Sequence, residues 1–214
     1  KFGKNLKEHF LGIHFFNPPR YMKLVEVIPG KETKKEVVDY VTRFCEDVLG
    51  KGVVICKDVP NFVANRIGVF DISNAIRIMI DKGLAVDELD AVIGKAVGRP
   101  GSSIFGTLDL VGLDVGYHVM NNLYNAVPDD EMRDYFVPSD FMKEMMEKKW
   151  LGNKTKQGFY KRTKDEKGKK AKLVLDYNTM EYRPAAKPRF DSVSAARKVE
   201  GDMADRLKPF FKGK

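Results

Sequence analysis

Two residues of this sequence have the chemistry of a general base and its orienting partner. His14 stands in the apolar stretch 10–16, and Glu26 stands in the next apolar stretch, 22–28. An imidazole beside a carboxylate can accept a proton while the carboxylate fixes its tautomer and stabilises its charged form. If the two stretches are strands that pair antiparallel about Arg20, the two side chains lie opposite each other, about 4.5–5.5 Å apart at Cβ.

Each of the two residues also has a simpler interpretation. A single histidine on an apolar strand is more often a satisfied core residue than a catalyst. Glu26 lies between Val25 and Val27, and a glutamate that faces solvent at the end of a strand gives the same alternation. The residue pattern alone leaves these alternatives open.

The elements that must position the pair are predicted from periodicity and turn residues. Both apolar stretches are rich in Phe, Ile, Leu and Val, and two prolines separate them, which predicts two strands joined by a turn. Thr33 and a glutamate three residues later form a capping-box pattern, which predicts a helix that begins at Thr33 and ends at Gly50. The short apolar run 53–56 predicts a third strand. Residues 1–59 therefore have the pattern of the end of an α/β domain.

The rest of the chain is predicted to be mostly helical. A boundary falls at residues 58–61, and residues 62–80 are apolar on nearly all faces, as in a central helix. Further helices are predicted at 86–97, at 105–127 and at 139–150, which makes residues 60–162 an all-helical domain. Residues 163–214 are predicted to be a basic hairpin or linker, with strands at 173–177 and 180–184, and a C-terminal helix at 192–211 that Pro209 weakens near its end.

Composition narrows the class of protein. Of the 214 residues 43% are hydrophobic, which is enough for a packed core, and no apolar run approaches the roughly 20 residues of a membrane span. No signal-peptide pattern is present. The two cysteines, Cys45 and Cys56, match no metal-binding spacing, so we expect free thiols, a cytoplasmic protein and no metal site. The net charge of +8 favours anionic partners, although a solvated surface is the simpler explanation.

Four segments together resemble one enzyme family. They are G-x-H-F-F-N-P-x-x-x-M-K-L-V-E at 12–26, P-N-F-x-x-N-R at 60–66, D-L-V-G-L-D at 109–114 and K-T-x-x-G-F-Y at 154–160. This set resembles the 3-hydroxyacyl-CoA dehydrogenases of fatty-acid β-oxidation, and the first segment is long and unusual. The family usually has glycine where this chain has Asn61. Asparagine tolerates the left-handed conformation, so the turn is expected to survive.

The resemblance implies a fold and roles for four residues. The fold is a Rossmann-type domain, of which residues 1–59 are the C-terminal part, followed by a helical domain like the C-terminal domain of 6-phosphogluconate dehydrogenase. His14 would be the base that removes the proton of the substrate 3-hydroxyl, and Glu26 would orient it. Asn65 would reach the substrate oxygen. Asn17 would position a loop or contact the nicotinamide, although a turn amide is the simpler interpretation.

The resemblance also implies a cofactor and partners. The cofactor is NAD, but no G-x-G-x-x-G occurs in the sequence, so we expect NAD to be bound mainly by a preceding segment and this chain alone to be inactive. The segment 98–105 lacks the family's Met-Gly-Pro, and together with the tail 175–184 it resembles the branch fused to an enoyl-CoA hydratase module. An acyl-CoA substrate and a homodimer formed by the helical domain are expected.

Other functions remain as alternatives. A dehydrogenase of a small 3-hydroxy acid shares this architecture but commonly uses lysine as its base, and no lysine is better placed than His14. A nucleic-acid-binding module is disfavoured because aromatic residues do not interleave with the basic run 161–172. That run is predicted to be a solvated hairpin, with binding of an anionic ligand as the minor interpretation. A non-catalytic helical assembly domain is the last alternative.

Overall fold

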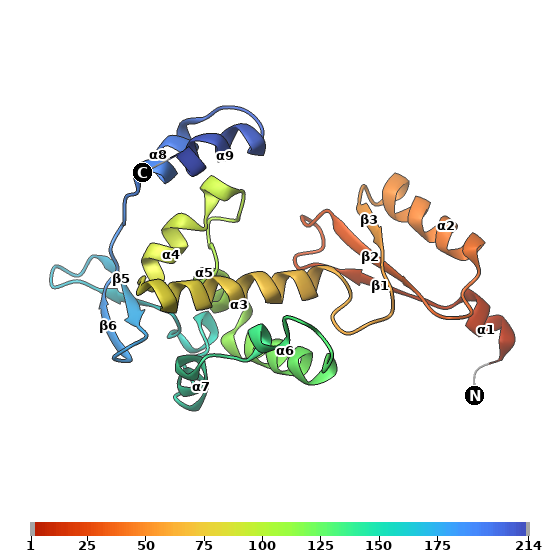
Figure 1. The fold of residues 1–214 in the computed structure, drawn as a ribbon, viewed down its shortest axis with the longest axis horizontal. Helices are drawn as coiled ribbons and strands as arrows, with labels where there is room; N and C mark the ends of the chain where they lie inside the picture. Colours follow the sequence, from red (N-terminus) through yellow and green to blue (C-terminus); the bar gives the residue numbers. More distant parts are fainter. Residues whose placement is uncertain (1–2, 213–214) are drawn as a thin grey trace. The chain divides into compact units, whose positions relative to one another are not determined.

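The computed structural model describes residues 3–212 and divides into two compact units, one ending at Gly68 and one beginning at Val69. The first unit contains α1 (Lys4–His9), β1 (Leu11–Phe15), β2 (Leu24–Pro29), α2 (Lys35–Arg43), a π-helical turn (Phe44–Val48) and β3 (Gly52–Ile55). It is an α/β unit, as the sequence predicts. Figure 1 shows the three strands side by side with α2 next to them.

The sheet of the first unit has the order β1-β2-β3, so β2 is its central strand. β1 and β2 are antiparallel, and their register pairs His14 with Glu26, which confirms the predicted opposition. β3 pairs with β2 in parallel. Because β2 has a neighbour on both sides, Val25 and Val27 are fully buried against α2, and Glu26 is fully buried between them on the other face.

The beginning of α2 differs from the prediction. The helix begins at Lys35 with Lys34 as its N-cap residue, and no side chain caps it. The Thr33 hydroxyl accepts the Gly30 N–H at 2.8 Å and donates to the Phe10 carbonyl at 2.5 Å. Thr33 therefore fixes the turn between β2 and α2, and a tertiary contact to the end of α1 outcompetes the local capping pattern.

The first helix after the boundary, α3 (Ala64–Lys82), is close to the predicted span. The second unit continues with α4 (Val86–Val92), α5 (Phe105–Val111), α6 (Leu113–Ala126) and α7 (Asp140–Glu147), and with short 3-10 turns at Lys95–Val97, Arg133–Phe136 and Asn153–Thr155. The stretch predicted as helical at 105–127 contains a break at Gly112, whose φ of 105° ends α5 before α6 begins.

A three-stranded antiparallel sheet joins these helices. Its strands are β4 (Tyr160–Lys164), β5 (Lys170–Asp176) and β6 (Glu181–Pro184), in the order β4-β5-β6. The predicted basic hairpin is present as β4 and β5. Val174 and Leu175 are buried in the same core as Phe105 and Phe159, so the sheet packs on the helices instead of forming a solvated linker. The second unit is therefore mainly, but not entirely, helical.

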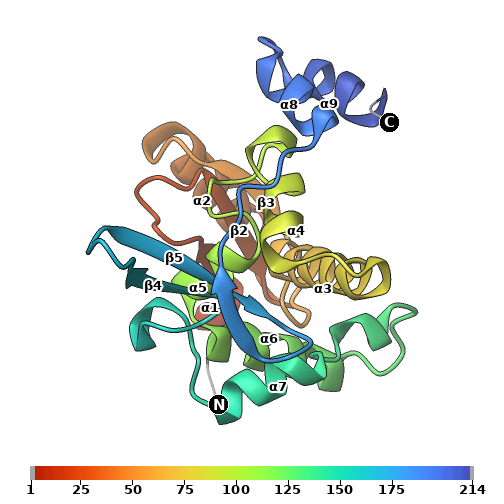
Figure 2. The same ribbon diagram turned by 90° about the vertical axis from the view of Figure 1, so that its left-hand side faces the viewer.

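The C-terminal region is a pair of helices, α8 (Asp191–Lys198) and α9 (Met203–Lys212), where the sequence predicts one. Gly201, with a φ of 145°, lies in the break, and Asp202 accepts the N–H of Asp205 at 2.9 Å as a new helix begins. Pro209 lies inside α9 and does not end it. Figure 2 shows the extended stretch that joins β6 to this pair. None of the helices formed by residues 3–212 has the length and apolar character needed to cross a bilayer.

Candidate active site

His14 and Glu26 form a hydrogen-bonded pair on one face of the β1–β2–β3 sheet. The His14 Nδ1 atom lies 2.7 Å from Glu26 Oε2. The Glu26 side chain is 1% exposed and the His14 side chain is 31% exposed, so the ring connects a buried carboxylate to the surface of the unit. This geometry is compatible with a general base held by a carboxylate that solvent does not reach.

The Glu26 carboxylate accepts hydrogen bonds from four groups. Oε2 faces His14, while Oε1 accepts the backbone N–H of Val63 at 3.0 Å and that of Ala64 at 2.8 Å. The thiol of Cys56, 3.5 Å away, also donates to Oε1. Burial acts to raise the pKa of Glu26, but these hydrogen bonds, led by the one from His14, hold it below its ordinary value.

The ionised state of Glu26 determines the tautomer of the imidazole. A carboxylate can only accept hydrogen bonds, so His14 Nδ1 must carry a hydrogen that it donates to Oε2. In the neutral ring, Nε2 is then left with its lone pair and can accept a proton. The sequence predicts this role for the pair, and the geometry of the site is compatible with it.

Two aromatic rings flank the imidazole. The centroid of the Phe16 ring lies 4.7 Å from that of His14, and the Phe62 centroid lies 5.8 Å away, both at tilted angles. Phe16 shares a face of the chain with His14 because it lies two residues further along. The rings limit the directions in which the imidazole can turn, so packing and the carboxylate together define its orientation.

Asn65 is the second residue of α3 and is half-buried. It directly follows Ala64, whose N–H binds Glu26, so the helix turn that carries Asn65 is fixed by the same carboxylate that holds His14. In the described part of the chain, the Asn65 side chain makes no hydrogen bond. Its amide is therefore free to bind a ligand, and its role as a substrate contact stays a prediction.

Asn17 lies outside the pair. It follows β1 at the second position beyond the strand, is exposed, and precedes Pro18 through a cis peptide bond. Its side chain makes no hydrogen bond within residues 3–212. The structure therefore neither joins Asn17 to His14 nor excludes the nicotinamide contact, which stays a prediction.

The turn before α3 has the strained backbone that the family resemblance implies. Asn61 has a φ of 61°, which confirms that asparagine occupies the left-handed region here. Phe62 follows with a φ of 48°, which the sequence did not indicate. Two successive positive φ values turn the chain so that the N–H groups of Val63 and Ala64 point at Glu26.

Three contributors to the site were not predicted as such. Phe16 and Phe62 belong to the quoted motifs, so their positions could have suggested contact with the imidazole. The thiol of Cys56 could not have been found, because only the parallel pairing of β3 with β2 brings it to Glu26. Burial raises the pKa of this thiol, as does the neighbouring carboxylate, so Cys56 donates as a neutral group.

Comparison with known proteins places both halves of the chain in one family. Residues 62–162 match the family model "3-hydroxyacyl-CoA dehydrogenase, C-terminal domain", and residues 3–59 match "3-hydroxyacyl-CoA dehydrogenase, NAD binding domain". The cofactor that the second match indicates is NAD. Within residues 3–212, no group of three or more His, Cys, Asp or Glu side chains could hold a metal ion.

Individual relatives agree with these matches. The chain is 45% identical over 200 residues to a "Probable 3-hydroxyacyl-CoA dehydrogenase" of Bacillus subtilis (strain 168), covering 94% of this chain and 25% of that protein. It is 47% identical over 166 residues to a protein of the same name from Deinococcus radiodurans, covering 78% and 47%. It is 36% identical over 167 residues to the "Fatty acid oxidation complex subunit alpha" of Acinetobacter baumannii (strain AYE), covering 78% and 22%.

Among solved structures, the crystal structure of (S)-3-hydroxybutyryl-CoA dehydrogenase from Ralstonia eutropha superposes with a TM-score of 0.61. The two sequences are 32% identical, and the match covers 70% of this chain and 50% of that one. The chain spans a quarter to about half of the length of its first two curated relatives. With both domain matches, these relatives and the opposed His14 and Glu26, the chain belongs to the 3-hydroxyacyl-CoA dehydrogenase family.

Proposed function

We propose that the whole protein containing this chain is an NAD-dependent (S)-3-hydroxyacyl-CoA dehydrogenase of fatty-acid β-oxidation, with His14 as its general base. The observation that carries the proposal is the 2.7 Å contact between His14 Nδ1 and the buried Glu26 carboxylate. Family membership supports the reaction class, and the similarity to a 3-hydroxybutyryl-CoA dehydrogenase supports a 3-hydroxyacyl thioester as the substrate.

The proposed chemistry of this chain is proton removal. The 3-hydroxyl of the substrate donates its proton to His14 Nε2, and the imidazolium that forms is stabilised by the hydrogen bond from Nδ1–H to Glu26. Glu26 acts through His14 and is a positioning residue. Asn65 binds the oxygen that becomes the carbonyl, and Asn17 lies on the nicotinamide side. The chemistry that NAD would supply when bound is a hydride acceptor for C3.

The described residues of this chain do not form the phosphate-binding turn that NAD needs. A pyrophosphate needs a glycine-rich turn that follows a strand and opens a helix. In the described part of the chain, Gly30 follows β2, but no further glycine lies in the turn after it. Gly50 lies before β3, and Gly52 is the first residue of β3. We therefore infer that the chain alone binds NAD poorly and is inactive. Robust oxidation of 3-hydroxybutyryl-CoA by the 214-residue chain alone would contradict this inference.

The role of His14 is tested in the full-length protein that contains this segment. His14→Gln is expected to lower kcat with 3-hydroxybutyryl-CoA about 10²–10⁴-fold, the usual contribution of a positioned base. His118→Gln, on the exposed surface of α6, is the matched control and is expected to keep wild-type kcat. Equal kcat for both variants would exclude His14 as the base.

The main alternative is a dehydrogenase of a small 3-hydroxy acid. Comparing kcat/KM for 3-hydroxybutyryl-CoA with that for free 3-hydroxybutyrate in the full-length protein separates the two. A preference for the free acid would favour the alternative. If the His14 variant kept full activity with either substrate, this chain would have no role in catalysis. That result would favour a helical assembly domain.

We further propose three features of the whole protein. The similarity to a fatty acid oxidation complex subunit supports association with an enoyl-CoA hydratase module. Exposed apolar side chains on α5 and α6, Leu110, Val111 and Val115, support self-association of the helical domain, which light scattering tests. The two free thiols support a reducing, cytoplasmic compartment. The domain boundaries after residues 59 and 162 stay a prediction.

A further inference from the structure

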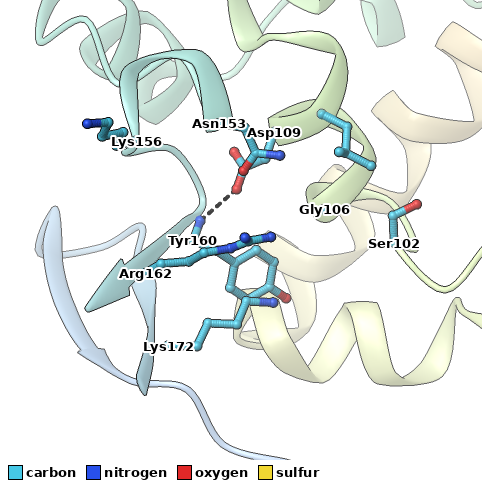
Figure 3. Close-up of a pocket in the computed structure, with 9 residues that line it drawn as sticks. Ser102, Gly106, Asp109, Asn153, Lys156, Tyr160, Arg162 and Lys172 are labelled. Carbon is cyan, nitrogen blue, oxygen red and sulfur yellow. Dashed lines mark hydrogen bonds between the residues drawn. The ribbon is translucent and has the colours of Figure 1, made fainter. Parts of the chain in front are cut away.

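A cavity of about 590 Å³ opens on the second unit beside the β4–β5 hairpin. Its lining comes from the hairpin, from α5 with the turn before it, and from the Asn153–Thr155 turn with the residue that follows it. The charged members are Asp109, Lys156, Arg162 and Lys172. Figure 3 shows Arg162 and Lys172 extending from the hairpin toward the Tyr160 ring, with Ser102 and Gly106 on the opposite side. The volume is within the range of small-molecule sites.

The hairpin register brings the two cations together. Arg162 and Lys172 are directly opposed across the β4–β5 pair, so both side chains lie on the same face. Opposed like charges are unfavourable in a hairpin unless an anion lies between them. Lys156 also lines the cavity from the neighbouring turn, but its side chain points away from Arg162 and Lys172 (Figure 3). Within residues 3–212, neither Arg162 nor Lys172 forms an ion pair with a carboxylate, although the charges of Asp90 and Asp109 act on Lys172 from a greater distance.

The carboxylates nearby are already bound by other groups. Asp109 is 4% exposed, and its two oxygens accept the N–H groups of Phe159 and Tyr160 at 2.8 Å each. Asp90 accepts the Tyr160 hydroxyl at 2.8 Å and the backbone N–H groups at the start of α5. These bonds build the walls of the cavity and hold Tyr160 in place, but they leave the cations without an acceptor.

The Lys172 amine packs over the aromatic ring of Tyr160 at the cavity. Its Nζ atom lies 3.3 Å from the centroid of the ring. Burial lowers the pKa of Lys172. An anion that replaces the lost hydration would stabilise the charged amine. A second hollow of about 620 Å³ shares Ser102, Gly106, Tyr160 and Lys172 with the first, so there is space beside the cations for the organic part of a larger ligand.

We propose that this cavity binds the phosphate group of a small molecule through Arg162 and Lys172. The planar guanidinium can bind two phosphate oxygens at once, and the Lys172 amine adds charge without requiring a fixed geometry. The guanidinium and the amine lie on one face of the hairpin, and this arrangement suits the several oxygens of a phosphate group. The proposal goes beyond the dehydrogenase reaction and does not depend on it.

The test is an NMR titration of the 214-residue chain at constant ionic strength, since screening by added salt would otherwise mask the effect. Inorganic phosphate and AMP are added separately, and the amides of Gly106 and Tyr160 are followed. Saturable shifts at about 1 mM phosphate are expected. Tighter binding of AMP would identify a phosphate ester as the ligand, and equal binding would identify free phosphate.

Two variants and one control decide the assignment. Arg162→Gln and Lys172→Met are each expected to weaken phosphate binding about tenfold, as for one lost charge-assisted contact. Lys167→Met removes the same charge from the exposed turn of the hairpin and is expected to bind phosphate like the wild type. The proposal is wrong if no saturable shifts occur below about 10 mM phosphate, or if the control loses as much affinity as the two variants.

Discussion

Replacing Glu26 by glutamine tests the base assignment most directly, because it changes hydrogen-bonding capacity and keeps the size of the side chain. In the native site Oε1 accepts two backbone N–H groups, at 3.0 and 2.8 Å, and Oε2 accepts His14 Nδ1–H at 2.7 Å. The glutamine carbonyl can replace only one of the two oxygens. The amide nitrogen, which can only donate, must take the other position.

The energy difference between the two orientations of the glutamine amide can be estimated from these contacts. If the amide nitrogen faced Val63 and Ala64, two buried N–H groups would lose their acceptor, at about 1–3 kcal/mol each. The carbonyl is therefore expected to keep Val63 and Ala64, so the amide nitrogen faces His14 Nδ1. His14 must then accept at Nδ1 and carry its hydrogen on Nε2. With at least about 2 kcal/mol favouring this state, the tautomer that can act as a base falls to about one part in 30.

Loss of the negative charge that stabilises the imidazolium adds to this effect, so kcat/KM is expected to fall about 10²–10⁴-fold. The assay is NADH formation from 3-hydroxybutyryl-CoA by the full-length protein. The tautomer is read independently from the imidazole ¹⁵N shifts of His14 in the 214-residue chain. Glu36→Gln, on the exposed side of α2, is the matched control. The reasoning is refuted if Glu26→Gln keeps wild-type kcat/KM, or if His14 keeps its hydrogen on Nδ1.

The remaining predictions concern the helix start and the second unit. Asn65→Ala in the full-length protein is expected to lower kcat/KM at least tenfold. The unfolding free energy is expected to change by less than about 0.5 kcal/mol, because the Asn65 amide has no partner in the described part of the chain. A loss of stability with unchanged kinetics would contradict a substrate contact. Gly158→Ala is expected to destabilise the chain by about 3 kcal/mol or more, seen as a lower thermal midpoint, since a Cβ there would overlap the Asp109 carboxylate and lie 2.5 Å from Gly152 Cα. Burial raises the pKa of Asp109 from 3.8 to about 6, so the folded state holds this proton more tightly than the unfolded state, and the contribution of Asp109 to stability falls as pH rises from about 4 to 6. The wild type is therefore expected to gain about 2 kcal/mol over Asp109→Asn between pH 6.5 and pH 4 in urea unfolding, and a constant difference would contradict the shift.

The sequence predicts the opposition of His14 and Glu26 because a hairpin makes it a local property. Two apolar strands on either side of a proline turn have a register that depends on their spacing alone, and the structure has this register. The burial of Glu26 is different. It depends on β3, which is far along the chain and pairs in parallel, so no local pattern distinguishes a buried glutamate from a solvated one.

The errors at helix ends have the same origin. Thr33 has the local pattern of a capping residue, but its hydroxyl binds the carbonyl of Phe10, 23 residues earlier. In the C-terminal region, the division of the predicted helix into two could have been read from the sequence. Gly201 and Asp202 are a stop signal and a start signal in succession, and the structure uses both to divide the predicted helix.

The spacing of the two strongest motifs has a physical explanation in the contacts of Glu26. One oxygen of its carboxylate holds the imidazole of His14, and the other holds the first N–H groups of the turn that begins α3. A negative charge at a helix N-terminus is favourable, so the carboxylate stabilises the start of the helix and also holds the His14 imidazole. A shift of the first turn of α3 would leave the N–H groups of Val63 and Ala64 unpaired or pull the carboxylate from Nδ1. Because Asn65 follows Ala64 directly, the position of its amide relative to His14 is fixed by a single side chain, which explains why the histidine, the glutamate and the turn before α3 occur together.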